Sequence, residues 1–223
     1  MNNRIRIKIC GITNLKDALE AARLGADAIG INFASESPRC TEGSVAQQIL
    51  KHLPPFVDPV GVYVNRLLAD IFTEAQRLGI RMIQWHGDSE KRELTDPFPF
   101  RLIAAFSIRD QKSLVQAHRY LELCRSVGRL PSAVLLDGHA AGQYGGTGQT
   151  APWEKIASFK PPDVPVILAG GLTPENVGEA ISVVRPYGVD VASGVESSPG
   201  QKDIHKMAQF VYNARLAASQ LRD

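Results

Sequence analysis

The sequence has few cysteines, no long apolar segment and no excess of charge of either sign. No apolar run approaches the roughly 18 residues that a membrane-spanning helix needs, which excludes such a span. The 25 basic and 23 acidic residues leave a net charge of +2, with Lys and Arg scattered along the chain. This balance argues against a nucleic-acid-binding surface.

Cysteine is scarce and its spacing is uninformative. Cys10, Cys40 and Cys124 are odd in number and form no C-x-x-C pair, so neither a disulfide framework nor a zinc site is indicated. The first ten residues alternate basic and apolar side chains and lack the apolar block of a secretory signal. We therefore expect a cytoplasmic protein.

Apolar residues make up 44% of the chain, which excludes a disordered protein. The 223 residues fit one α/β barrel of about 200 to 250 residues, so we expect a single domain over 1–223. Eight short apolar segments have the length and composition of strands: Ile5–Cys10, Ala28–Phe33, Pro59–Val64, Ile80–Trp85, Phe100–Phe106, Ala133–Leu136, Pro165–Ala169 and Val189–Ala192.

Helical or helix-sized segments follow these strands. Asn14 is placed to cap the first helix and Gly25 to end it. Apolar residues at helical spacing predict further helices over Leu67–Leu78, Asp110–Cys124, Pro174–Val184 and Ile204–Leu216. The strand segments are continuously apolar, which indicates burial on both faces and hence a parallel sheet. Eight units of about 28 residues each favour a (β/α)8 barrel, with an open doubly wound sheet as the alternative.

In such a barrel, function belongs to residues at the carboxyl ends of the strands. Gly170-Gly171 and Ser193-Gly194 follow the last two strand segments, where barrels commonly bind phosphate through backbone N–H groups. A further glycine-rich run, containing Gly146, follows the sixth strand. The simpler interpretation of each glycine pair is a tight turn.

Four side chains at or near strand ends allow two interpretations each. Cys10 is either a small buried apolar residue or a thiolate base assisted by Lys8. Asp137 either points into a site or caps the next helix. His86 is a core histidine or a ligand contact, and Arg39 is a solvated charge or a carboxylate-binding group.

Taken together, seven short motifs in order along the chain resemble the phosphoribosylanthranilate isomerase family of tryptophan biosynthesis. The motifs are Lys8-Ile9-Cys10-Gly11-Ile12, Ser37-Pro38-Arg39, Gln84-Trp85-His86-Gly87, Leu135-Leu136-Asp137, Gly145-Gly146-Thr147-Gly148, Leu168-Ala169-Gly170-Gly171-Leu172 and Ser193-Gly194-Val195-Glu196-Ser197. The resemblance extends over essentially the whole chain and implies a single-domain (β/α)8 barrel that needs no metal or organic cofactor.

The resemblance also implies a reaction, an Amadori rearrangement of N-(5-phosphoribosyl)anthranilate. In it, Cys10 would be the general base and Asp137 the general acid, and Arg39 would hold the anthranilate carboxylate. The late glycine loops would bind the phosphate, Asp190 would face the anthranilate amine, and His86 would contact the substrate. The expected partner is a small phosphorylated molecule, not a nucleic acid or membrane, and the chain would be a monomer or homodimer.

Cys40, Trp85 and Gln149 depart from the family's usual residues, but none of these changes removes a proposed acid, base or anion contact. Other phosphate-binding barrels remain as alternatives. A thiamin phosphate synthase-like transferase or a metal-dependent epimerase should show carboxylate or histidine metal ligands, which we do not find in the sequence. A non-catalytic phosphosugar-binding barrel would lack the acid or the base. The sequence leaves open whether a second aminoaldose phosphate is also a substrate.

Overall fold

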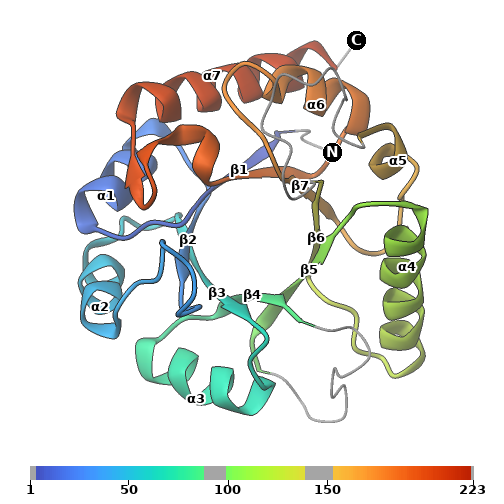
Figure 1. Ribbon diagram of the computed structural model, residues 1–223, viewed down its shortest axis with the longest axis horizontal. Coiled ribbons are helices and arrows are strands. Elements are labelled where there is room, and N and C mark those ends of the chain that lie inside the picture. The colour runs from blue at the N-terminus through green and yellow to red at the C-terminus, as the bar shows by residue number, and fades with distance from the viewer. Residues whose placement is uncertain (1–3, 88–98, 139–152, 222–223) are drawn as a thin grey trace.

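The computed structural model describes residues 4–87, 99–138 and 153–221. In this part of the chain, eight parallel strands pair in sequence order and β8 returns to β1, which closes the barrel and confirms the predicted (β/α)8 fold (Figure 1). The strands are β1 (Arg6–Cys10), β2 (Ala28–Asn32), β3 (Asp58–Val64), β4 (Met82–His86), β5 (Arg101–Ser107), β6 (Ala133–Asp137), β7 (Val166–Ala169) and β8 (Gly188–Val191).

Helices surround the barrel on its outer side (Figure 1). They are α1 (Leu15–Leu24), α2 (Gly43–His52), α3 (Leu68–Leu78), α4 (Gln111–Ser126), α5 (Trp153–Ala157), α6 (Val177–Val184) and α7 (Ile204–Gln220). As predicted, the Asn14 side chain caps α1 by accepting a hydrogen bond from the Asp17 N–H, and Gly25 ends α1 in the left-handed conformation, with φ of 97°. Among these helices none is long and apolar enough to cross a membrane, within the residues described.

Two predicted helix boundaries are wrong by three residues or more. The last helix, α7, extends to Gln220, four residues beyond the predicted end at Leu216. The sequence places the start of a helix at Pro174, whereas α6 begins at Val177. The reason is local hydrogen bonding: the Thr173 N–H donates to Asn176 Oδ1 over 2.8 Å, and Asn176 Nδ2 donates to the Gly171 carbonyl over 2.9 Å. The Asn176 side chain thereby holds residues 173–176 as a turn.

The strands separate two apolar layers. Ile7 and Ile9 belong to the large layer between the strands and the helices, so the alternation of side chains along β1 places Lys8 and Cys10 inside the barrel. A second, smaller cluster of buried apolar residues is separate from this layer and consists of Val60, Ile103, Ala105, Ala133, Leu135 and Ala169. Among the buried polar residues of the strands, Lys8 and Asp190 lie where β1 pairs with β8.

The connection from β8 to α7 contains structure that the sequence analysis did not predict. It consists of a 3-10 turn (η2, Ser193–Val195) and a short antiparallel hairpin formed by β9 (Glu196–Ser198) and β10 (Gln201–Lys202). At the tip of the hairpin, the Gly200 carbonyl accepts a hydrogen bond from the Thr13 hydroxyl. The hairpin therefore packs on the connection between β1 and α1.

Candidate active site

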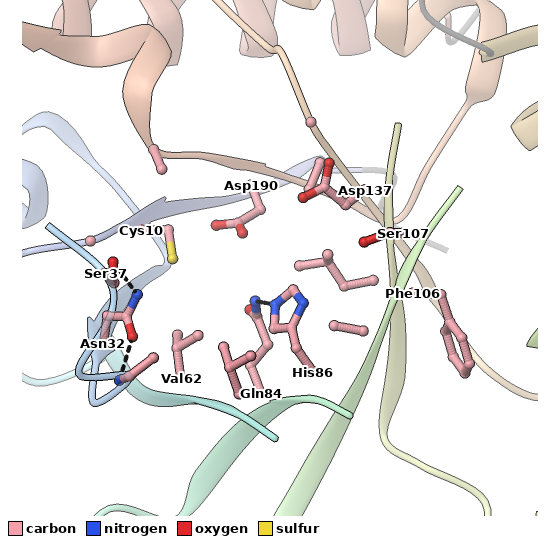
Figure 2. A pocket seen from close by; sticks show the side chains of 18 of the residues that line it. Cys10, Asn32, Ser37, Val62, Gln84, His86, Phe106, Ser107, Asp137 and Asp190 are labelled. Atoms are coloured by element: carbon pink, nitrogen blue, oxygen red, sulfur yellow. Dashed lines mark hydrogen bonds between the residues drawn. The ribbon is translucent and has the colours of Figure 1, made fainter. Parts of the chain in front are cut away.

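A cavity of about 1020 Å³ is lined by residues at the carboxyl ends of the strands. It brings together most of the side chains and glycines that the sequence predicted as a site: Cys10, Arg39, His86, Asp137, Gly170, Gly171, Asp190 and Ser193. Figure 2 shows the Cys10 sulfur and the carboxylates of Asp137 and Asp190 directed into this cavity. Gly146 lies outside the described residues.

Cys10 ends β1, and its position depends on a glycine in the adjacent strand. A Cβ atom at Gly30 would lie 2.7 Å from Cys10 Sγ and 3.0 Å from Lys8 Nζ. Both distances are shorter than nonbonded atoms tolerate without displacement. Gly30 therefore provides the space in which the thiol and the lysine lie together.

Lys8 and Asp190 form an ion pair inside the barrel. The two residues are paired across the β1–β8 ladder, and Lys8 Nζ donates to Asp190 Oδ1 over 2.8 Å. Their side chains are only 5% and 7% exposed. Burial of two charges is costly, so the removal of either partner would leave the other charge uncompensated.

The environment of Cys10 raises the pKa of its thiol. Burial has the largest effect and the neighbouring Asp190 carboxylate adds to it, while Lys8 and Lys202 act in the opposite direction. Lys8 thus favours the thiolate, as expected from the sequence, but it is outweighed. Burial on its own would lower the pKa of Lys8, yet Asp190 and Cys10 raise it, so the lysine keeps its charge. Near neutral pH Cys10 is therefore mainly a protonated thiol.

Asp137 is the last residue of β6, where it lies in register with Ser107 of β5. Its backbone is fixed on both sides, because the Ile108 N–H donates to its carbonyl over 2.8 Å and the next residue's N–H, from Gly138, donates to Ala169 O over 3.0 Å. Its carboxylate is directed into the cavity (Figure 2). Of the two interpretations of Asp137, the structure therefore supports the one in which its side chain points into a site.

Gln84 is a cavity residue that the sequence analysis quoted in a motif without giving it a role. It lies two residues before His86 on β4, so both side chains point to the same, inner side of the barrel. Gln84 Nε2 is 2.8 Å from His86 Nε2 (Figure 2). The Gln84 side chain is buried, and within the described residues its Oε1 has no hydrogen-bond partner. His86 is therefore a cavity residue held by a polar neighbour, not a histidine enclosed by apolar core.

Arg39 is held by an acidic residue that the sequence analysis also left without a role. Arg39 Nε donates to Glu196 Oε1 over 2.8 Å, and Nη2 donates to Oε2 over 2.6 Å. The Arg39 side chain is 22% exposed and that of Glu196 only 5%. The guanidinium at the cavity is thus fixed by a bidentate ion pair, and is not a mobile solvated charge.

The glycine loops after β7 and β8 are in direct backbone contact. Gly170 and Gly171 have φ values of 91° and 64°, which side chains disfavour. Gly194 does not line the cavity, but a Cβ atom there would be 1.9 Å from the Leu172 carbonyl oxygen. Only glycine lets the two loops approach this closely. Among the described residues, no group of three or more His, Cys, Asp or Glu side chains is arranged to hold a metal ion.

Lys8→Met tests the electrostatic account of the thiol. Because the Lys8 charge lowers the pKa of Cys10, its removal should raise this pKa further and slow alkylation by iodoacetamide at a given pH. A rise of one unit corresponds to about tenfold less thiolate. Labelling is measured by peptide mass, because Cys40 is exposed and also reacts. Lys51→Met, at an exposed position of α2, is the matched control. Unchanged or faster labelling of Cys10 in Lys8→Met contradicts the account.

Comparison with known proteins identifies the family. The family model described as N-(5'phosphoribosyl)anthranilate (PRA) isomerase matches residues 7–213. The isomerase of Geobacter sulfurreducens is 44% identical over 211 residues, covering 95% of this chain and 98% of the relative. A structure of monomers of the dimeric Thermotoga maritima isomerase has a TM-score of 0.77 and 34% identity, covering 94% of this chain and 98% of that one.

A further solved isomerase, in complex with reduced 1-(o-carboxyphenylamino)-1-deoxyribulose 5-phosphate, has a TM-score of 0.76 and 35% identity, again covering 94% and 98% of the two chains. The family match extends over nearly all of this chain, and it agrees with the barrel and with the cavity at its carboxyl end. The chain belongs to the phosphoribosylanthranilate isomerase family of tryptophan biosynthesis.

Proposed function

We propose that the cavity catalyses the Amadori rearrangement of N-(5-phosphoribosyl)anthranilate to 1-(2-carboxyphenylamino)-1-deoxyribulose 5-phosphate, with Asp137 as general acid and Cys10 as general base. The observation that carries the proposal is the convergence of this thiol and this carboxylate on one cavity from strands β1 and β6. Such convergence at the carboxyl end of a barrel is how this fold assembles catalytic groups.

In the first step, Asp137 gives its proton to the ribose ring oxygen as the C1–O bond breaks, and the anthranilate nitrogen, which keeps its own proton, shares its electron pair with C1 to form a protonated imine. In the second step, the Cys10 thiolate removes the proton from C2, and the electron pair moves toward the nitrogen to give an enolamine. The enolamine then tautomerises to the ketone. The acid and the base act on different atoms of the substrate, which suits their separate positions around the cavity.

The remaining residues bind and orient the substrate. Arg39 holds the anthranilate carboxylate, and the backbone N–H groups around Gly170, Gly171, Ser193 and Gly194 bind the phosphate. Asp190 faces the anthranilate amine and His86 contacts the sugar. Gly146 joins the phosphate site on the strength of the sequence motif alone. The product analogue bound by a related isomerase carries the same carboxylate and phosphate groups.

The direct test is turnover. The purified chain should consume the fluorescent substrate N-(5-phosphoribosyl)anthranilate, and the reaction is measured as the decrease in its fluorescence. We propose that it does so without a metal or an organic cofactor, so a chelator should leave the rate unchanged. Absence of turnover by the folded chain, or a requirement for added metal, would contradict the proposed function.

Cys10→Ala tests the base. We expect kcat to fall by at least about 10² while the chain remains folded, and Cys10→Ser to be almost as poor, since a hydroxyl is much less acidic than a thiol. In the unsubstituted chain, kcat/KM should increase with pH through the neutral range, because the raised pKa of Cys10 keeps the thiolate a minority species there. Normal turnover by Cys10→Ala would remove the base from the mechanism.

Asp137→Asn tests the acid. The amide has nearly the same shape but no acidic proton, so we expect kcat to fall by about 10² to 10⁴ with little change in KM. The matched control is Asp163→Asn, at an exposed aspartate that is paired with Arg125 and does not line the cavity. This variant should keep its activity. Near-normal kcat in Asp137→Asn overturns the assignment.

Arg39→Ala tests the carboxylate contact. We expect KM to rise more than kcat falls, with a loss of about 2 to 3 kcal/mol in kcat/KM. Arg39→Lys should recover only part of the loss, because an ammonium group cannot form the same two parallel hydrogen bonds. Full recovery by lysine would show that charge alone matters at this position.

We also propose that the chain acts on this small phosphorylated molecule as a monomer or a homodimer in the cytoplasm, with no nucleic-acid or membrane partner. A related isomerase is described as dimeric, which supports the second of the two forms. Light scattering during size-exclusion chromatography decides between monomer and homodimer. A larger assembly would contradict the proposal.

A further inference from the structure

Glu196 lies at the centre of a small network of positive charges beside the cavity. Its Oε1 accepts from Arg39 Nε and from Lys202 Nζ, each over 2.8 Å, and its Oε2 accepts from Arg39 Nη2. The Lys202 side chain is fully buried and also donates to the Ala192 carbonyl over 3.1 Å. One carboxylate therefore joins the loop after β2 to the hairpin after β8.

The network keeps Glu196 ionised. Burial would raise the pKa of its carboxyl, but hydrogen bonds from Arg39 and Lys202 and their positive charges outweigh burial, and the pKa is lowered. An ionised carboxylate can accept two parallel hydrogen bonds from a guanidinium, which fixes both the position and the plane of the arginine. Arg39 consequently has a defined orientation before any ligand arrives.

Neighbouring contacts reinforce this placement of Arg39. The backbone N–H of Arg39 donates to Ser37 Oγ over 3.1 Å, so a hydrogen bond inside the loop after β2 stabilises its conformation. From the hairpin side, the tip at Gly200 contacts the same loop: a Cβ atom there would lie 3.2 Å from the Pro38 carbonyl oxygen. The loop that carries Arg39 thus packs against the hairpin that begins with Glu196.

Glu196 is also close in sequence to the proposed phosphate loop. Ser193 and Gly194 precede it by three and two residues, within the 3-10 turn that leads directly into β9. The backbone of Glu196 is held as well, because Lys206 Nζ of α7 donates to the Glu196 carbonyl over 2.8 Å. A single short segment therefore carries the phosphate-binding groups and the residue that fixes Arg39.

We propose that Glu196 is a positioning residue that aims Arg39 at the substrate carboxylate and sets the distance between the carboxylate and phosphate sites. Glu196 engages the Nε–Nη2 edge of the guanidinium, and a substrate carboxylate would engage the adjacent Nη1–Nη2 edge. The inference rests on the proposed role of Arg39 in binding the substrate. It adds a specificity device: the cavity selects molecules whose two anionic groups match the spacing that Glu196 fixes.

Glu196→Gln is the principal test. Glutamine preserves the size and one oxygen acceptor but places an NH₂ group against an N–H of Arg39, so the bidentate pair is lost. We expect KM for N-(5-phosphoribosyl)anthranilate to rise about tenfold while kcat changes less than about threefold. Inhibition by inorganic phosphate should keep its inhibition constant, because the phosphate loops are not altered. A residue that merely held the segment together would weaken both.

A double variant separates action through Arg39 from a general effect. If Glu196 acts through Arg39, Glu196→Gln should not raise KM further in the Arg39→Ala background, whereas independent effects would multiply. Glu74→Gln is the matched control, because Glu74 forms a comparable pair with Arg66 at 2.6 Å and does not line the cavity. Its KM should remain within about twofold of the unsubstituted value.

Glu196→Asp covers the case in which the glutamine variant does not fold. Aspartate keeps the charge beside buried Lys202 but is one methylene shorter, so we expect an intermediate rise in KM, with phosphate inhibition again unchanged. Unchanged KM in a folded Glu196 variant, alongside a raised KM in Arg39→Ala, overturns this inference alone. Unchanged KM in Arg39→Ala overturns both the inference and the proposed role of Arg39.

Discussion

The ion pair between Lys8 and Asp190 is the constraint on which the catalytic end of this barrel depends. It lies across the pairing of β1 with β8, the contact that closes the ring of strands. Replacement of both charges by apolar side chains would remove the two charges that lie closest to the Cys10 thiol along β1 and β8. The charged side chains of Lys8 and Asp190 make the barrel interior polar beside the thiol, and both Cys10 and Asp190 line the cavity.

A second group of charges acts at the rim of the cavity instead of its floor. Arg39 comes from the loop after β2, and Glu196 and Lys202 come from the β9–β10 hairpin. Short hydrogen bonds join them, although Arg39 and Glu196 are 157 residues apart in the chain. This second group orients the Arg39 guanidinium, and its buried Lys202 also acts to lower the pKa of Cys10. The two groups of charges are therefore linked electrostatically through Lys202 and Cys10.

Much of this arrangement could be predicted from the sequence, because continuous apolar segments, capping residues and strand-end motifs are local signals. Asn14, Gly25 and the eight strands are of this kind, as is the grouping of Cys10, Asp137 and Asp190 at one end of the barrel. The start of α6 was misplaced because proline at a first helical turn looks the same as proline in a turn held by Asn176. Glu196 and Gln84 were present in recognised motifs, but their partners are distant in the chain or two residues along a strand. The net direction of the Cys10 pKa depends on burial, which no sequence spacing reveals.

The protonated state of Cys10 has a consequence for the durability of the protein. Oxidants such as peroxide attack the thiolate, so a cysteine that is mainly a thiol at neutral pH is oxidised to the sulfenic acid more slowly. The same burial and the same neighbouring carboxylate that raise the pKa of the Cys10 thiol therefore slow its oxidation.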